Sequence, residues 1–304
     1  MTDPDHTNDT PDGDARPAKK PRRWCRRLRR GALAMLTGVA LVALASCVHL
    51  DHPNPAYPAT KSEVKAAIEV MEEIPSGLDR PVVVLSGWRS PSMTGGQLAE
   101  RIRAMTGAEE DQVLSISYMW GDDIPEIADT VARKVADALG SEIDEASGQL
   151  WTAEVDVVAI SMGGLVARTA WADSDEVGRT QDVRLNINTL YTLGTPHRGA
   201  RLARWIRLDD ASAQMEPGSS FLAALDDATL GERHDLTIVP YATLRDSWVG
   251  AGNSAPTGQD PIWVPGRLML SHHLISLDKR IQADLGRRLR GEPPLGEASA
   301  PPRD

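Results

Sequence analysis

The sequence predicts an α/β fold with a mostly parallel, doubly wound sheet and helices on both of its faces. Strand-like and helix-like patterns alternate along most of the 304 residues, as expected for right-handed crossovers between parallel strands. The run Pro81–Leu85 is apolar without interruption, which is typical of a strand covered on both faces. Because about 100–200 residues make a typical domain, we expect one large domain with tails.

The segment before this domain has the pattern of an export signal. Residues 1–30 are polar, acidic at first and then strongly basic, and we predict that they are disordered. Gly31–Ser46 is an uncharged run of sixteen residues, which is short for a helix that needs about 20 residues to cross a bilayer. A basic flank, an apolar run and small residues at its end are typical of a secretory signal. Leu44-Ala-Ser-Cys47 resembles a bacterial lipobox, which implies that Cys47 carries a lipid.

The alternative to a cleaved lipoprotein signal is an uncleaved anchor helix over 31–47. Both interpretations predict an exported protein of the cell envelope, with its domain outside the cytoplasmic membrane. The two cysteines, Cys25 and Cys47, precede the domain, so Cys47 fits a lipid attachment site better than a disulfide. The formal net charge of −10 disfavours a nucleic-acid partner, which needs a basic face. Membrane association is therefore expected through the N-terminal anchor, and the oligomeric state is left open.

The elements of the domain follow from local patterns. Residues 48–60 contain three prolines and are predicted to be a linker, with the domain over 61–288. Thr60-Lys-Ser-Glu63 is a capping-box pattern that begins an amphipathic helix, and Ile127 to Leu139 form a second helix closed by Gly140. Further strands are expected at 113–118, 155–160, 185–193 and 236–244, a closing helix at 271–285, and a disordered tail at 289–304.

A single serine stands at a predicted strand-to-helix turn. Asp156-Val-Val-Ala-Ile-Ser161-Met-Gly-Gly164 is an A-x-S-x-G variant of the G-x-S-x-G turn, with Ala159 and Gly163 at the two glycine positions. Such a turn exposes the serine hydroxyl in a strained conformation, so small residues are needed on both sides. Ser161 is therefore the candidate nucleophile.

A serine nucleophile needs a base and a group that orients the base. Within the predicted domain, His197, His272 and His273 are the candidate bases, and the pair at 272–273 follows the last strand region. Asp246 comes directly after a predicted strand, and Asp260 is the alternative acid. The chain order serine, aspartate, histidine is the one that α/β-hydrolases use, and it favours Ser161 and Asp246 with one of the paired histidines.

The chain resembles serine lipases and esterases of the α/β-hydrolase fold, the small bacterial triacylglycerol lipases and the inositol-deacylase-like group above all. The shared blocks are Ile160–Arg168, Leu193-Gly-Thr-Pro-His-Arg-Gly-Ala200 and Met215–Leu222, and the resemblance covers about residues 80–287. It implies that His272 is the base, with His273 as the alternative, because the apolar helix positions that follow the base in these lipases match Ile281 and Leu285. It also implies that His197 has a structural role.

The resemblance further implies an oxyanion hole made by the backbone amides of Trp88 and Met162. The loop that normally begins His-Gly begins Ser86-Gly87 here, which removes no backbone donor but changes the surroundings of the loop. Two tryptophans, Trp88 and Trp120, are candidates for an acyl pocket. A candidate lid spans 200–235, and Leu202, Trp205 and Ile206 are the residues expected on its apolar underside.

These patterns together predict a serine-dependent carboxylic ester hydrolase that acts on acyl esters, with lipids as the expected substrates. No dinucleotide or phosphate-loop motif and no metal-ligand spacing occurs in the sequence, so no cofactor is expected. A thioesterase or an amidase would use the same three groups. A surface lipoprotein that keeps the fold only as a binding module is the alternative from another class, and the altered Ser86-Gly87 loop is what supports it.

Overall fold

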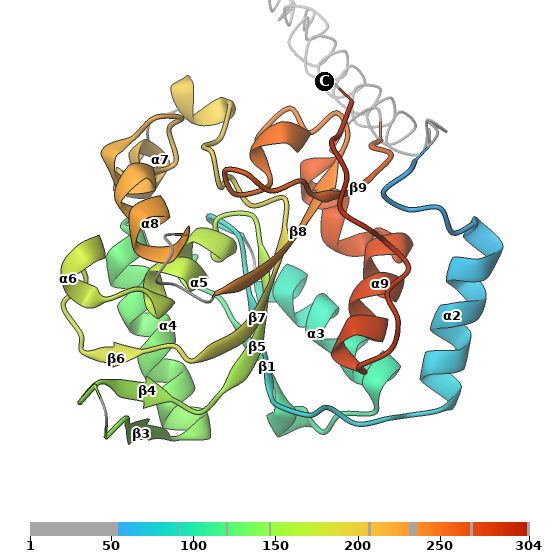
Figure 1. Ribbon diagram of the computed structural model, residues 1–304, viewed down its shortest axis with the longest axis horizontal. Coiled ribbons are helices and arrows are strands. Elements are labelled where there is room, and N and C mark those ends of the chain that lie inside the picture. The colour runs from blue at the N-terminus through green and yellow to red at the C-terminus, as the bar shows by residue number, and fades with distance from the viewer. Residues whose placement is uncertain are drawn as a thin grey trace, which may run out of the picture. The chain divides into compact units, whose positions relative to one another are not determined.

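The computed structural model describes residues 54–302, except for 91, 120, 146, 206–207, 231–235 and 268–269. In these residues, six strands form one parallel sheet in the order β2-β1-β5-β7-β8-β9 (Figure 1). The strands are β1 (Val82–Leu85), β2 (Val113–Ile116), β5 (Val155–Ile160), β7 (Ile187–Leu193), β8 (Thr237–Thr243) and β9 (Ile262–Val264). The predicted α/β fold with a parallel sheet is confirmed.

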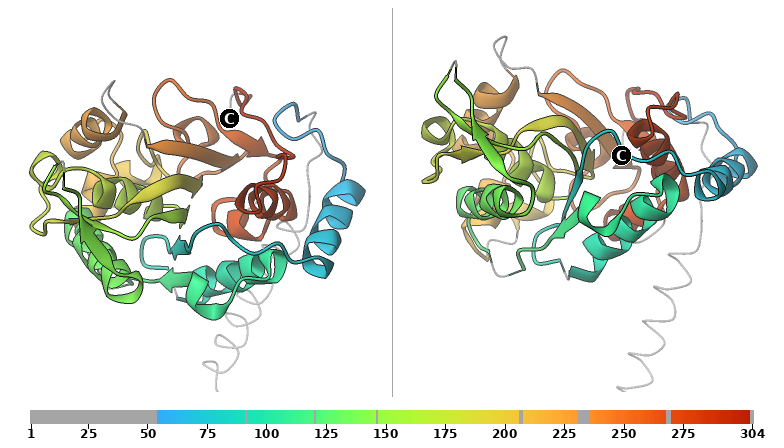
Figure 2. Two further views of the ribbon diagram at one scale, coloured as in Figure 1. Left: turned by 60° about the horizontal axis from the view of Figure 1, so that its bottom comes forward. Right: turned by 90° about the horizontal axis from the view of Figure 1, so that it is seen from below.

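Helices cover both faces of this sheet, as Figures 1 and 2 show. One face packs against α4 (Ile124–Leu139) and α5 (Gly163–Trp171), and the other packs against α2 (Lys61–Glu73), α3 (Ser92–Thr106) and α9 (Lys279–Leu289). The segment between β7 and β8 adds α7 (Asp210–Gln214) and α8 (Ser220–Leu230), and α6 (Ser174–Val177) follows α5.

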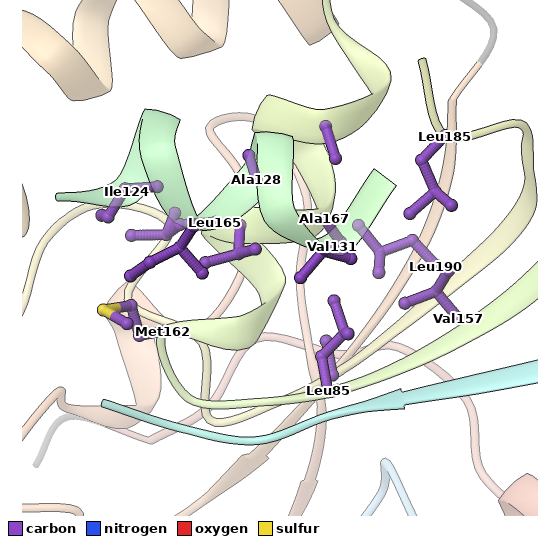
Figure 3. Packing of buried hydrophobic residues seen from close by; sticks show 14 of the residues in the cluster. Leu85, Ile124, Ala128, Val131, Val157, Met162, Leu165, Ala167, Leu185 and Leu190 are labelled. Carbon is purple, nitrogen blue, oxygen red and sulfur yellow. The ribbon is translucent and has the colours of Figure 1, made fainter. Parts of the chain in front are cut away.

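The strands of the sheet are buried on both faces because their side chains alternate between two apolar clusters. In β1, Val83 and Leu85 join the cluster under α4 and α5, whereas Val82 and Val84 join the cluster under α2, α3 and α9. This alternation has the period of two that a strand dictates. Figure 3 shows side chains of α4 and α5 meeting those of the strands, among them Ile124, Val131, Leu165, Leu85, Val157 and Leu190.

The predicted helix starts depend on side-chain caps. The capping box before α2 is present, with the Thr60 hydroxyl accepting from the Glu63 amide and the Glu63 carboxylate accepting from the Thr60 amide. Helix α4 is capped by Asp123 and closed by Gly140, which has a φ of 90°. Helix α3 was not expected from the sequence, because Gly95 and Gly96 weaken its helical pattern.

The strand expected at 185–193 begins two residues later in the structure, as β7 at Ile187, and a separate short strand precedes it. Val183–Arg184 form β6, which joins β3 (Ser141–Ile143) and β4 (Leu150–Thr152) in a small separate sheet beside α4 (Figures 1 and 2). The chain crosses to the main sheet at Leu185, whose amide donates to the carbonyl of Ala170. A register shift at Val155 accompanies this crossing. The pairing partner therefore changes from β4 at Val183–Arg184 to β5 from Ile187 on, which the residue pattern alone does not reveal.

The end of the chain also differs from the sequence-based prediction. The segment expected as the start of a closing helix is a 3-10 helix, η4 (His272–Leu277), and α9 begins only at Lys279, where Asp278 accepts from the Arg280 amide. Leu277 is accordingly exposed rather than part of the core. The expected disordered tail is hydrogen bonded to the domain: the amides of Leu295 and Gly296 donate to Asp284, and Trp263 donates to Ser299.

Within the described ranges, no helix has the length and apolar character needed to span a bilayer. The predicted signal or anchor at 31–47, including Cys47, lies outside the described residues.

The buried Asp284 carboxylate accepts several hydrogen bonds. Besides the tail amides, the Tyr241 hydroxyl donates to it at 2.7 Å and Arg288 donates at 2.8 Å. Asp284→Ala should lower the free energy of unfolding by about 3 kcal/mol or more, because it leaves several buried donors without an acceptor. Urea denaturation measures this loss. The exposed carboxylate Asp111 provides the control, since Asp111→Ala should change stability by less than about 0.5 kcal/mol. A loss below about 1 kcal/mol for Asp284→Ala would contradict the prediction.

Candidate active site

Ser161 lies in the sharp turn between β5 and α5, and its backbone has a φ of 53°. Non-glycine residues adopt this left-handed conformation only where the surroundings enforce it. The Ser161 amide donates to the Leu193 carbonyl at 2.8 Å, and the Thr195 hydroxyl donates to the Ser161 carbonyl at 2.7 Å. The turn is thus fixed from the neighbouring strand β7 and the loop that follows it.

The small residues around Ser161 are required by close approach of other chain segments. A Cβ atom at Gly163 would stand 2.7 Å from the Ser86 carbonyl oxygen, and one at Gly164 would stand 2.3 Å from the Thr195 hydroxyl. Both distances are shorter than a carbon–oxygen contact allows, so only glycine fits. The sequence shows these glycines, but their neighbours come from loops that are distant along the chain.

Ser161, His272 and Asp246 form one continuous chain of hydrogen bonds. Ser161 Oγ is 2.9 Å from His272 Nε2, and His272 Nδ1 is 2.7 Å from Asp246 Oδ2. Since an ionised carboxylate only accepts hydrogen bonds, the proton is on Nδ1, and Nε2 is left to accept from the Ser161 hydroxyl. This is the arrangement in which a histidine can take a proton from a serine.

The Asp246 carboxylate is buried and held by its own loop. It is 1% exposed, and its other oxygen, Oδ1, accepts from the amides of Trp248 and Val249 at 2.9 Å each. These two bonds orient the carboxylate toward the imidazole. The alternative acid, Asp260, is exposed.

The two adjacent histidines have different surroundings. His272 is 7% exposed and stacks parallel to the Trp248 ring at a centroid distance of 5.7 Å. His273 is exposed and meets the edge of the same Trp248 ring at 4.5 Å. Partial burial lowers the pKa of His273, and the neighbouring His272 lowers it further. Trp248 therefore contacts both histidines. Nothing in the sequence pattern indicates this contact, although Trp248 lies two residues after Asp246.

The loop after β1 passes next to the serine. A Cβ atom on Gly87 would lie 3.2 Å from Ser161 Cβ, so the peptide that leads into Trp88 adjoins the nucleophile. Met162, the other residue expected to supply an oxyanion amide, is the N-cap of α5 and is buried. Helix N-termini present unpaired amides that favour negative charge. Both expected oxyanion residues thus lie beside Ser161.

A cavity of about 430 Å³ contains Ser161 and His272 in its wall. Most of its lining is apolar, and its residues include Trp88, Ile160, Pro196, Ala200, Leu202, Ala203, Met215, Trp248 and Val249. The segment between β7 and β8, expected as a candidate lid, contributes Leu202. Trp205, expected on the apolar underside, is instead 86% exposed and directly follows the short 3-10 helix Leu202–Arg204. Trp120 and Ile206 lie outside the described residues.

His197 is buried away from this hydrogen-bonded chain. Its Nδ1 is 3.2 Å from the Arg168 guanidinium and its Nε2 is 3.0 Å from the Thr192 hydroxyl. Arginine can only donate, so Nδ1 accepts and Nε2 carries the proton. Burial lowers the pKa of His197 well below its usual value, and the positive charge of Arg168 lowers it further. His197 is therefore a neutral residue that supports Arg168, whose guanidinium also pairs with Asp226 at 2.7 Å.

Among the described residues, no group of three or more His, Cys, Asp or Glu side chains could hold a metal ion. The parallel sheet, with Ser161 in the sharp turn between its central strand β5 and helix α5, has the architecture of the α/β-hydrolase fold. The chain has this fold, as the sequence predicted.

Comparisons with known proteins give distant likenesses. No protein-family model and no curated protein matches the chain. Among solved structures it is similar to the lipase BlEst2 from Bacillus licheniformis, with 16% identity over 72% of this chain and 94% of the lipase at a TM-score of 0.48. It is similar to the phospholipase PlaB from Legionella pneumophila in complex with thio-NAD, with 15% identity over 58% of this chain and a TM-score of 0.44. The match spans 44% of that phospholipase.

The RedJ thioesterase from the prodiginine pathway of Streptomyces coelicolor is similar at 16% identity over 70% of this chain and 91% of RedJ, with a TM-score of 0.34. Likenesses at these identities and TM-scores assign no role to any residue of this chain.

The neutral state of His197 predicts a pH dependence of stability. Its pKa is near 6.5 in the unfolded chain and lower in the folded protein, so below about pH 6.5 the unfolded chain binds the extra proton. Stability should therefore fall as the pH falls, by up to about 1.4 kcal/mol per pH unit from this residue.

Urea denaturation at pH 7, 6 and 5 measures this effect by comparison with His197→Gln, which has no titrating ring. The wild type should lose more stability than the variant between pH 6 and 5. Equal losses would show that His197 becomes protonated in the folded protein.

Proposed function

We propose that this protein is a serine-dependent carboxylic ester hydrolase, a lipase or esterase that acts on acyl esters of lipids. The observation that carries the proposal is the hydrogen-bonded chain Ser161–His272–Asp246 in the wall of a mostly apolar cavity. An apolar cavity suits an acyl chain, and the polar groups at one place in its wall suit the ester carbonyl.

In the proposed reaction, Ser161 Oγ attacks the ester carbonyl carbon while its proton passes to His272 Nε2. The carbonyl oxygen becomes an oxyanion that the amides of Trp88 and Met162 stabilise. The carbon–oxygen bond to the alcohol then breaks, and the alcohol leaves with the proton from Nε2. Water, deprotonated by Nε2, then attacks the acyl carbon. The bond from this carbon to Ser161 Oγ breaks, the carboxylic acid leaves, and Nε2 returns the proton to Oγ. Asp246 holds the imidazole in the tautomer that this sequence needs and stabilises its positive form.

Export and lipid attachment at Cys47 belong to the same proposal and remain predictions from the sequence. A thioester or amide substrate would be attacked by the same groups, so those activities are outcomes of the test below.

The proposal predicts that the purified domain hydrolyses p-nitrophenyl esters and that Ser161→Ala abolishes this hydrolysis. The variant removes the nucleophile but little packing, so its thermal transition should stay near that of the wild type. A series of acyl chain lengths, with matched thioester and anilide substrates, identifies the preferred acyl group and bond. A wild-type protein that is folded and hydrolyses none of these substrates would favour a binding module, and full activity in Ser161→Ala would refute the mechanism.

The different surroundings of the adjacent histidines predict different effects of their removal. His272→Ala should lower kcat by about 10⁴-fold or more, because it removes the nitrogen that is hydrogen bonded to Ser161 Oγ and takes its proton. His273→Ala should stay within about tenfold of the wild type, since the hydrogen bonds to Ser161 and Asp246 come from His272, whereas His273 meets the Trp248 and His272 rings edge-on. Steady-state kinetics on the two variants decides the assignment, and the reverse order of effects would make His273 the base.

A further inference from the structure

The loop after β1 is held in an unexpected way in this chain. It begins with Ser86, whose side chain is buried and whose hydroxyl has no hydrogen-bond partner among the described residues. Arg89, three residues on, has a left-handed backbone with a φ of 48°, a conformation that has to be enforced by contacts. The Ser86 side chain therefore does not anchor the loop that carries the Trp88 amide.

The side chains of Trp88 and Arg89 instead meet one carboxylate oxygen. Asp209 Oδ2 accepts from the Trp88 indole at 3.0 Å and from the Arg89 guanidinium at 3.1 Å through Nε and 3.0 Å through Nη2. The Asp209 side chain is 3% exposed, whereas that of Arg89 is half-exposed. Three donors from two consecutive residues thus converge on one buried atom.

The other oxygen of Asp209 has a different task. Oδ1 accepts from the Ser212 amide at 2.8 Å and caps α7. The carboxylate thus connects the β7–β8 segment to the loop after β1. Both segments contribute to the cavity wall, with Ser212 and Trp88 in the lining. Burial alone would raise the pKa of Asp209, but the hydrogen bonds from Ser212, Trp88 and Arg89 outweigh burial and hold the pKa below its usual value. The group is therefore charged at neutral pH.

We propose that Asp209 is a positioning residue for the oxyanion hole: it fixes the Trp88–Arg89 pair so that the Trp88 amide faces the developing oxyanion. This inference rests on the proposed function. An oxyanion donor is effective only at about 2.7–3.1 Å from the oxygen, and a displacement of about 1 Å can cost about 10²-fold in rate. When the side chains of Trp88 and Arg89 are both fixed, the two peptides on either side of Trp88 have less freedom to rotate. The first of them, between Gly87 and Trp88, carries the Trp88 N–H.

Asp209→Ser separates the two tasks of the carboxylate. Serine is a good N-cap and preserves the start of α7, but its short side chain cannot reach Trp88 and Arg89. We expect kcat for the preferred ester to fall about 10- to 100-fold, with KM changed less than about threefold and the thermal transition near that of the wild type. The matched control is Asp173→Ser: Asp173 caps α6 and pairs with Arg184 at 3.7 Å, and that variant should keep wild-type kinetics.

A second readout is the rate at which a fluorophosphonate labels Ser161, because phosphonylation also develops negative charge on an oxygen facing the hole. This rate should fall in Asp209→Ser in parallel with kcat. A wild-type kcat and labelling rate in Asp209→Ser, or an effect on KM alone, would overturn the inference while leaving the hydrolase proposal intact. A folded wild type that neither hydrolyses esters nor reacts with the probe would overturn the proposed function and this inference with it.

Discussion

The left-handed backbone of Ser161 is the constraint on which the rest of the site depends. A non-glycine residue in this conformation costs about 1–3 kcal/mol, and here Leu193 and Thr195 hold it through two hydrogen bonds. The turn must be tight enough for the loops after β1 and β7 to touch it, and glycine at 163 and 164 makes this contact sterically possible. The hydroxyl of Ser161 then projects into the cavity, where His272 reaches it.

The segment between β7 and β8 is attached to this core at two charged points. Asp226 in α8 pairs with the buried Arg168 of α5, and Asp209 binds the loop after β1. Each pair has one buried partner, Arg168 or Asp209, and one that is partly exposed. Such a pair is weak evidence for stability but depends strongly on geometry. We infer that their effect here is to fix where the segment lies, and therefore the shape of the apolar wall that Leu202, Ala203 and Met215 contribute. His197 is neutral and accepts a hydrogen bond from the Arg168 guanidinium, so it adds no second positive charge beside that group.

Much of the fold could be predicted because it rests on local patterns. The apolar run at 81–85, the capping box at Thr60 and the periodicity of 127–139 each depend on residues close together in sequence, and each corresponds to an element of the structure. Strand β9 was missed because three residues between prolines carry too little pattern. The tail was predicted to be disordered because its own composition does not reveal its partners. In the structure its residues up to 302 include amides that donate to Asp284 and Pro261.

The sequence by itself determined the doubly wound fold, the turn at Ser161 and the order in which Ser161, Asp246 and His272 occur along the chain. Only the tertiary structure decided which of two adjacent histidines faces the serine, because successive residues of a 3-10 helix point about a third of a turn apart and a one-residue shift is invisible in the sequence. It also decided what Asp209 and Trp248 contact. Their partners lie on other loops, and such contacts arise only when the parallel strands bring their carboxyl ends to one edge of the sheet.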